Sequence, residues 1–335
     1  MTRRRLIVAC VALAAVSASA RAQTNALVVT GLGGEEKYHQ LFMSLGDRLT
    51  AALHARFFLP DSNVAWLGED SRNATSKSRL YRGKSTAENI RAQIDKMVAR
   101  ARPGDQILIV LIGHGSGDGE DTKFNIPGPD LTARDFRAIL DRFAAQRVAF
   151  LDLTTASGDV IATLSAPGRI IVTSTKSAYE RNESQFARFF VDALEKPGVA
   201  DVDKDGRVSL LEAYRYAAAE TRRSYSNDER LMTEHAQLDD DGDGKGTDLP
   251  DGRGAGDGLQ ARRFFIDAGA VEARLAASDP QLAKLYADKF AAEDKIDALK
   301  RRKASMVEDA YYAELEPLLL ALARTARDIR RREGR

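Results

Sequence analysis

The chain has 335 residues, with 50 basic and 49 acidic side chains and a formal charge of +1. A balance this close to neutral gives no electrostatic case for a nucleic-acid partner. Apolar residues make up 44% of the chain, which is ample for a folded core of about two domains.

The first 22 residues have the order of a secretory signal peptide. Arginines at 3–5 precede an apolar run at 6–18, and Ala20-Arg21-Ala22 is a small-x-small site for cleavage before Gln23. The run is shorter than the roughly 18 residues that span a bilayer, so a membrane anchor is the less favoured alternative. Cleavage changes the formal charge to −3 and removes Cys10, the single cysteine. The sequence predicts a periplasmic or secreted protein with no membrane span after signal removal, no disulfide and no thiol nucleophile.

Residues 23–200 alternate between strand-like and helix-like patterns. Four apolar runs predict buried strands, at 26–30, 107–112, 148–153 and 169–174. Segments with helical spacing lie at 41–58, 85–98, 131–143 and 185–194. Ser85-x-x-Glu88 predicts a capping box at the start of the second of these helices. The alternation predicts an α/β layer fold with a mostly parallel sheet.

The composition changes after residue 200. Residues 201–270 are predicted to hold an acidic loop, a helix to about Tyr225 and an Asp/Gly-rich loop at 238–258. Asp279-Pro280 then predicts a helix start. Apolar residues recur at alternating spacings of three and four through 280–332, which predicts an antiparallel helical hairpin of coiled-coil type at 275–335. Such a hairpin packs against the main domain or against a second copy of the chain.

The segment Asp201–Glu212 matches a calcium loop of EF-hand type. Such a loop places oxygen ligands at positions 1, 3, 5, 7, 9 and 12, with Gly at position 6, here Gly206. The predicted calcium ligands are the side chains of Asp201, Asp203, Asp205, Ser209 and Glu212 and the backbone carbonyl of Arg207. The alternative is an exposed acidic turn. Because the preceding helix is predicted to end near Glu195, the entering helix is missing or bent, which favours a structural calcium site over a switch.

Asp239, Asp241, Asp243 and Gly244 repeat the first half of this pattern. Position 12 would be Pro250, which has no side-chain ligand. The residues that can take its place are Thr247, Asp248 and Asp251. A second calcium site and a solvated acidic loop are equally compatible with this sequence.

Polar side chains follow two of the predicted strands. His114 comes just after the strand at 107–112, and Thr155 and Ser157 come just after the strand at 148–153. Loops at the carboxyl ends of neighbouring parallel strands form a ligand crevice. An imidazole on one loop and hydroxyls on the other is the arrangement of a base and a nucleophile.

These motifs carry a resemblance to a known family. Residues 25–194 resemble the caspase-like cysteine peptidases, and the legumain-type branch most closely, through His114-Gly115-Ser116 and the small-residue turn ending in Ser157-Gly158. The resemblance implies a caspase-like three-layer fold with His114 as the general base. It also implies a nucleophilic cysteine three residues before Gly158, where this chain has Thr155.

The absence of that cysteine changes the expected chemistry. A threonine hydroxyl is harder to deprotonate than a thiol, and threonine nucleophiles usually rely on a free N-terminal amine that an internal Thr155 lacks. We therefore expect a calcium-binding pseudopeptidase that binds an unidentified peptide or protein, or that acts as a scaffold with self-association through 280–332. The alternative is an active hydrolase that uses Thr155 or Ser157 with His114.

Overall fold

The computed structural model describes residues 22–70, 78–117, 121–196, 198–204, 206–252, 256–267 and 277–334. The predicted signal peptide, apart from Ala22, and the predicted ligand Asp205 lie outside these ranges.

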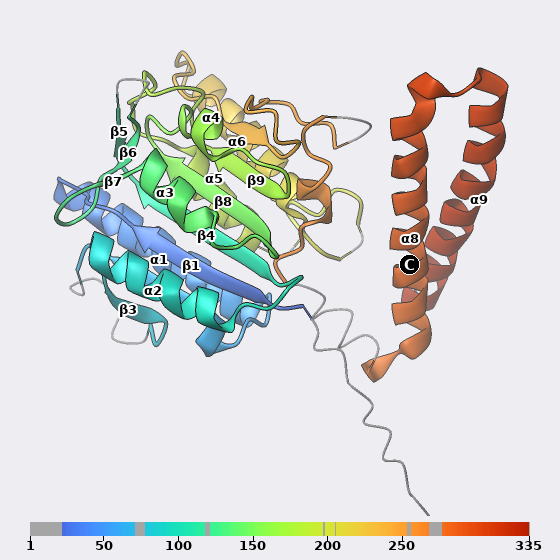
Figure 1. Ribbon diagram of the computed structural model, residues 1–335, viewed down its shortest axis with the longest axis horizontal. Coiled ribbons are helices and arrows are strands. Elements are labelled where there is room, and N and C mark those ends of the chain that lie inside the picture. Colours follow the sequence, from blue (N-terminus) through green and yellow to red (C-terminus); the bar gives the residue numbers. More distant parts are fainter. Residues whose placement is uncertain are drawn as a thin grey trace, which may run out of the picture.

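Among the described residues, seven strands form one sheet at the centre of an α/β body (Figure 1). The strand order is β10-β9-β8-β4-β1-β2-β3, and every neighbouring pair is parallel except β10 on β9. The strands are β1 (Thr24–Thr30), β2 (Val64–Gly68), β3 (Tyr81–Lys84), β4 (Gln106–Gly113), β8 (Arg147–Thr154), β9 (Arg169–Thr173) and β10 (Gln237–Asp239). The predicted mixed α/β fold with a mostly parallel sheet is confirmed.

Helices cover both faces of this sheet, so the body has three layers (Figure 1). One core lies under α1 (Glu36–Ala55), α5 (Phe186–Glu195) and α6 (Leu210–Asn227). The other lies under α2 (Ala87–Arg100), α3 (Ala133–Leu140) and α4 (Val160–Leu164). Alternate residues of each strand enter opposite cores, because successive strand side chains point to opposite faces: Val28 and Val110 enter the first, and Val29 and Leu111 the second.

Shorter elements decorate this framework. β5 (Gly115–Ser116), β6 (Lys123–Phe124) and β7 (Leu131–Thr132) form a small antiparallel sheet beyond the end of β4. Two 3₁₀ turns, η1 (Asp61–Asn63) and η2 (Ala261–Arg263), lie in connecting segments.

The predicted capping box at Ser85 is wrong by one residue. Thr86 is the N-cap of α2, and its hydroxyl accepts a hydrogen bond from the Asn89 backbone N–H. Thr86 is the last residue with extended dihedral angles before the helix, which is the conformation that an N-cap requires.

Two long helices follow the α/β body. α8 (Pro280–Arg302) continues through η3 (Lys303–Ser305) to α9 (Glu308–Glu333), and the two helices pack side by side (Figure 1). They share a small core of their own, which contains Leu282 and Ile329.

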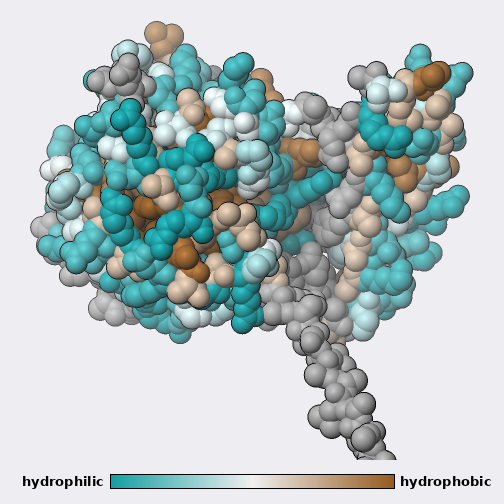
Figure 2. Space-filling view, viewed as in Figure 1, coloured by the Kyte–Doolittle hydropathy of each residue, from teal (hydrophilic) through white to brown (hydrophobic). Residues whose placement is uncertain are grey.

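The surface of this helix pair is mixed. Tyr312, Leu319 and Leu320 of α9 are about half exposed, and Figure 2 shows apolar residues interspersed with hydrophilic ones on the helices. Contact with the α/β body includes an ion pair between Lys289 Nζ and Asp203 Oδ2 at 3.5 Å.

Candidate functional site

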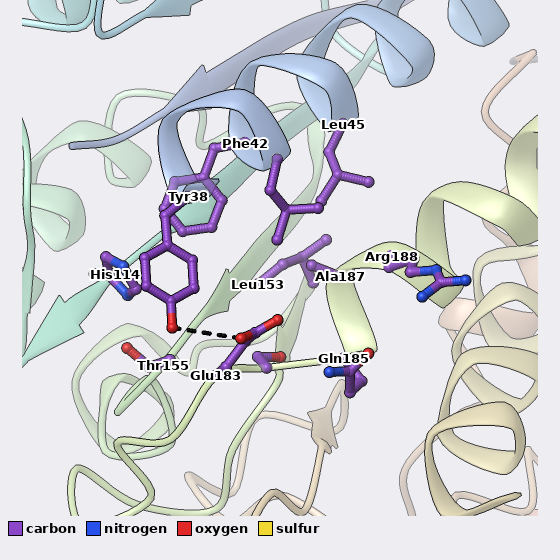
Figure 3. Close-up of a pocket in the computed structure, with 13 residues that line it drawn as sticks. Tyr38, Phe42, Leu45, His114, Leu153, Thr155, Glu183, Gln185, Ala187 and Arg188 are labelled. Carbon is purple, nitrogen blue, oxygen red and sulfur yellow. Dashed lines mark hydrogen bonds between the residues drawn. The ribbon is translucent and has the colours of Figure 1, made fainter. Parts of the chain in front are cut away.

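The loops that follow β4 and β8 lie side by side at one edge of the sheet. β4 and β8 are neighbours, with Gly113 opposite Thr154, so the residues just after them meet. His114 and Thr155 line one pocket, as the sequence predicts (Figure 3). The other walls come from α1 and from the start of α5, and they include Tyr38, Phe42, Leu45, Glu183, Gln185 and Arg188.

His114 is half-buried against two aromatic rings. The imidazole meets Tyr38 and Phe42 edge-on, with ring centroids 4.8 and 5.0 Å away. Burial lowers the pKa of His114, and this effect exceeds the opposing ones of a hydrogen bond with the Gly33 backbone and of nearby glutamates, among them Glu183. The lowered pKa favours the neutral imidazole at pH 7.

Thr155 is held by peptide groups. Its side chain is almost fully buried, and its Oγ1 accepts a hydrogen bond from the Gly115 N–H at 3.2 Å. The same hydroxyl donates to the Gly115 carbonyl oxygen at 3.4 Å. The proton of the predicted nucleophile is thus directed to a backbone carbonyl, in the residue that follows His114.

Ser157, the alternative nucleophile, lies away from the pocket. It is fully buried, its backbone N–H donates to Thr175 Oγ1 at 2.8 Å, and its own hydroxyl lies 3.2 Å from the same atom. Of the two predicted hydroxyls, Thr155 alone lines the pocket.

A buried carboxyl lies beneath these loops. Asp152 is the third-last residue of β8, and Oδ1 accepts a hydrogen bond from the Thr154 hydroxyl at 2.6 Å. Burial raises the pKa of Asp152 to about 7, although the hydrogen bonds from Thr154 act in the opposite direction. The sequence gives no sign of this group, because an isolated Asp in an apolar run has no motif.

The aromatic wall of the pocket also escapes sequence reasoning. Tyr38 and Phe42 are four residues apart on α1, and their rings are 6.0 Å apart. The Tyr38 hydroxyl donates to Glu183 Oε2 at 3.4 Å, which closes one side of the pocket (Figure 3). The helical spacing is the only signal of this wall, and buried helix faces share that spacing.

The first acidic loop brings its predicted carboxylates together. One oxygen from each of Asp201, Asp203 and Glu212 lies within 4.8 Å of the other two. The Gly206 N–H donates to Asp201 Oδ2 at 3.1 Å, and Gly206 has a φ of +85°, which suits the predicted glycine turn. Ser209 is the N-cap of α6 and forms a capping box with Glu212. Three carboxylates around one point suit a hard cation such as calcium.

The helix geometry around this loop matches the prediction. α5 ends at Glu195, and residues 198–200 are not helical, so no helix runs directly into Asp201. The side chain of Arg207 pairs with Asp267 at 2.6 Å and covers the Phe265 ring. This contact turns the guanidinium, which is cationic and cannot ligate calcium, away from the loop, and the backbone carbonyl of Arg207 is the group that can serve at position 7.

The second acidic loop also brings three carboxylates together. One oxygen from each of Asp239, Asp241 and Asp243 lies within 4.8 Å of the other two. Burial raises the pKa of Asp239, and the charges of Asp241 and Asp243 add to this, while hydrogen bonds involving Ser165 and the Gly242 N–H oppose it.

Comparison with known proteins gives no family for this chain. No protein-family model matches it, and no curated protein is significantly similar to it. None of the described helices combines the length and the apolar character needed to cross a bilayer. The likeness to caspase-like peptidases therefore stays a prediction from His114, Thr155 and the turns around them.

Proposed function

We propose that this chain is an exported, calcium-binding pseudopeptidase of caspase-like, legumain-type fold, which binds a peptide or protein in the pocket between β4, β8 and α1. The observation that carries the proposal is the hydrogen bonding of Thr155. Its hydroxyl is engaged by the N–H and carbonyl of Gly115, so the pocket has a base-like imidazole without an activated nucleophile.

The pocket suits a peptide ligand on chemical grounds. Its floor and one wall are apolar, from Phe42, Leu45 and Leu153, while Glu183 and Arg188 bring charges of both signs to its lining. A side chain can enter the apolar part while the peptide backbone or a neighbouring charge meets the polar part. Ligand sites commonly combine a mainly apolar cavity with a few placed polar groups.

The first acidic loop supports this pocket through the helices. α6 begins within the loop and packs against α5, and the start of α5 forms one wall of the pocket. A calcium ion bound by Asp201, Asp203 and Glu212 would offset two of the three converging negative charges and fix the start of α6. Its proposed role is structural, because no helix enters the loop directly.

The test of the pseudopeptidase proposal is a cleavage assay. The chain beginning at Gln23 is incubated with peptides that have Asn or Asp before the scissile bond. We expect no cleavage above background. Cleavage that disappears in both Thr155→Ala and His114→Ala would overturn the proposal. Thr155→Cys is the positive control for the pocket, and cleavage gained with this variant would show that the site lacks only the thiol.

The second candidate function is hydrolysis by Thr155 with His114 as the base. It is favoured by one observation, that both side chains line the same pocket. A ligand that displaces the Thr155 hydroxyl from Gly115 would free it to reach the imidazole. The same assay decides, since this candidate requires cleavage by the unmodified chain.

Ligand binding has its own measurement. Fluorescence anisotropy with labelled Asn- and Asp-containing peptides is expected to show binding that Tyr38→Ala weakens several-fold. Tyr179→Ala is the matched control, because Tyr179 is 75% exposed and does not line the pocket. Equal effects of the two substitutions would exclude this pocket as the binding site.

Calcium binding is tested by thermal melting. A ligand that binds only the folded state raises the melting temperature as its concentration increases. We expect such a rise with calcium, and we expect Glu212→Gln to reduce it. Glutamine loses the charge and the acceptor for the Val202 N–H but keeps the acceptor for the Ser209 N–H, so the cap of α6 is retained. A melting temperature indifferent to calcium would refute the structural calcium site.

Export and self-association complete the proposal. Export predicts an N-terminus at Gln23 in protein recovered from the periplasm or medium. Self-association through 280–332 predicts a concentration-dependent mass by light scattering that falls when Leu319 and Leu320, both about half exposed on α9, are replaced by Glu.

A further inference from the structure

We propose that Asp239, Asp241 and Asp243 hold a second calcium ion, at the end of β10. This goes beyond the proposed function and does not depend on the first loop. The carboxylates of the three residues face one another, with one oxygen from each within 4.8 Å of the other two. Because like charges this close repel one another, the arrangement calls for a cation between them.

An independent observation points to a ligand at this cluster. Asp239 is 1% exposed, and its Oδ2 is buried without a hydrogen-bond partner. The nearby Ser165 hydroxyl accepts a hydrogen bond from the Gly244 N–H at 3.1 Å, and no donor reaches Oδ2. A buried carboxylate oxygen left without a donor costs free energy, and a coordinated metal ion removes that cost.

The loop holds the other oxygens in place through backbone N–H groups. Gly242 N–H donates to Asp239 Oδ1 at 3.1 Å, and the Asp243 N–H donates to Asp241 Oδ1 at 3.0 Å. Gly242 and Gly244 have φ values of +84° and +80°, so the chain turns back at both points. The Lys245 N–H likewise donates to Asp243 Oδ1 at 2.8 Å, so each carboxylate is oriented before an ion arrives.

The neighbouring acid has a different role. Asp240 points away from the cluster and caps another segment, accepting hydrogen bonds from the Gly258 N–H at 2.8 Å and the Ala261 N–H at 2.7 Å. Asp240 is therefore a structural residue, and alternate acids of the run, Asp239 and Asp241, supply ligands. This separation of roles distinguishes the loop from a solvated acidic tract.

The ion would secure the only antiparallel strand of the described sheet. β10 pairs with β9 through three residues, ending at Asp239 opposite Ile171. The Gly244 N–H donates to Ser165 Oγ at 3.1 Å, so the loop also rests on the segment between α4 and β9. Bound calcium would join this short edge strand to its neighbour more firmly than three residues of pairing do alone.

Calcium is the cation that this donor set favours. Calcium takes six to eight hard oxygen ligands in flexible geometry, whereas magnesium requires near-ideal octahedral coordination and keeps several waters. Pro250 stands where an EF-hand has its bidentate Glu, and the cluster offers three carboxylates. We therefore expect weaker binding here than at the first loop, where Glu212 is present.

The test is calorimetric titration of the chelator-treated full chain with calcium chloride. The unmodified chain should bind two ions, and Glu212→Gln and Asp241→Asn one each. Asp228→Asn, which removes an exposed charge at the end of α6 and outside both clusters, should still bind two. Asp241 is exposed, and asparagine retains the acceptor for the Asp243 N–H, so the variant should fold.

The outcomes separate the two sites. A Glu212→Gln chain that binds no calcium, or an Asp241→Asn chain that still binds two ions, would overturn the second site. An Asp241→Asn chain that binds none, beside a Glu212→Gln chain that binds one, would overturn the first loop and leave the second standing. If Asp241→Asn fails to fold, Asp243→Asn replaces it, with a loss of affinity of at least tenfold expected for the weaker ion.

Discussion

Asp152 makes stability depend on pH in an unusual direction. Its pKa in the folded state is raised to about 7 by burial, from 3.8 for an ordinary aspartic acid. Between these values the folded state holds a proton that the unfolded state has released. Stability therefore falls as pH rises from 4 to 7, by up to about 4 kcal/mol from this residue, and is flat above 7. Urea titrations of Asp152→Asn should show a shallower slope, since Asp257, whose pKa burial also raises to about 7, still contributes.

Asp141, whose pKa is shifted in the opposite direction, is the control. Arg169 lowers the pKa of Asp141, whose exposed carboxyl it contacts at 2.5 Å. The contribution of Asp141 is present at neutral pH and lost as pH falls through its lowered pKa. Asp141→Asn should therefore leave the slope between pH 4 and 7 that Asp152 produces. A slope as steep in Asp152→Asn as in the unmodified chain would show that Asp152 does not contribute to it.

At the scale of single residues, the sequence predicts which side chains lie near one another but not which hydrogen bonds they form. His114 and Thr155 follow neighbouring strands, and strand adjacency suffices to bring them to one pocket. Ser157 is only two residues further, but the turn carries it under Thr175. The direction of a side chain in such a turn depends on contacts with a third loop, which no local pattern contains.

Gly158 is the point where the loops after β8 and β9 cross. A Cβ atom at this position would overlap the backbone of Lys176 and Ser177. Gly158→Ala must push the two loops apart, and overpacking of this kind typically costs about 1–3 kcal/mol. We expect chemical denaturation to show that loss, together with weaker peptide binding, because Thr155 is on the displaced loop.

The comparison for this substitution is Gly168→Ala. Gly168 has a φ of +80° and no atom within 4 Å of an added Cβ, so its cost is conformational alone, about 1 kcal/mol. Peptide binding should be unaffected, since Gly168 does not line the pocket. If Gly158→Ala reduced stability as little as Gly168→Ala does, the loops after β8 and β9 would be less tightly packed than the structure indicates.

At the element scale, the sequence predicts β1, β4, β8 and β9 but misses β2, which is also fully buried. β4 and β8 are buried along almost their whole length, so each gives an unbroken apolar run. β3 is four residues long with intermediate and exposed positions, and β10 is three residues at the edge of an Asp-rich tract. Neither has enough apolar residues to be recognised as a strand in the sequence. Both strands form because pairing with the rest of the sheet stabilises them.

At the scale of the whole molecule, the α/β body and the helix pair have separate hydrophobic cores. The spacing of apolar residues in the sequence predicts this separation. The periodicity at 280–332 differs from that of the α/β body, and α8 and α9 bury Leu282, Tyr286 and Ile329 apart from the cores of the sheet. The spacing of apolar residues does not predict how the helix pair contacts the α/β body. Those contacts include charged side chains such as Lys289 and Asp203, whose pairing depends on the folded arrangement of both parts.

The pair formed by Lys289 and Asp203 links the helices to the first calcium loop. Lys289 Nζ lies 3.5 Å from Asp203 Oδ2, and the lysine side chain is 11% exposed. A positive charge beside a predicted calcium ligand opposes the binding of the cation. Lys289→Ala should therefore tighten calcium binding by about two- to fivefold, the equivalent of about 0.5–1 kcal/mol for a pair of this kind.

Calorimetry in an Asp241→Asn background measures this effect at the first loop alone. Lys289→Arg should leave the affinity nearly unchanged because it retains the charge, and so should Lys284→Ala, whose ammonium pairs with Asp288 on its own helix. Coupling of two binding events is reciprocal, so calcium should in turn weaken the contact of α8 with the loop. An affinity that falls in Lys289→Ala would mean that the lysine orders Asp203 for the ion and does not compete with it.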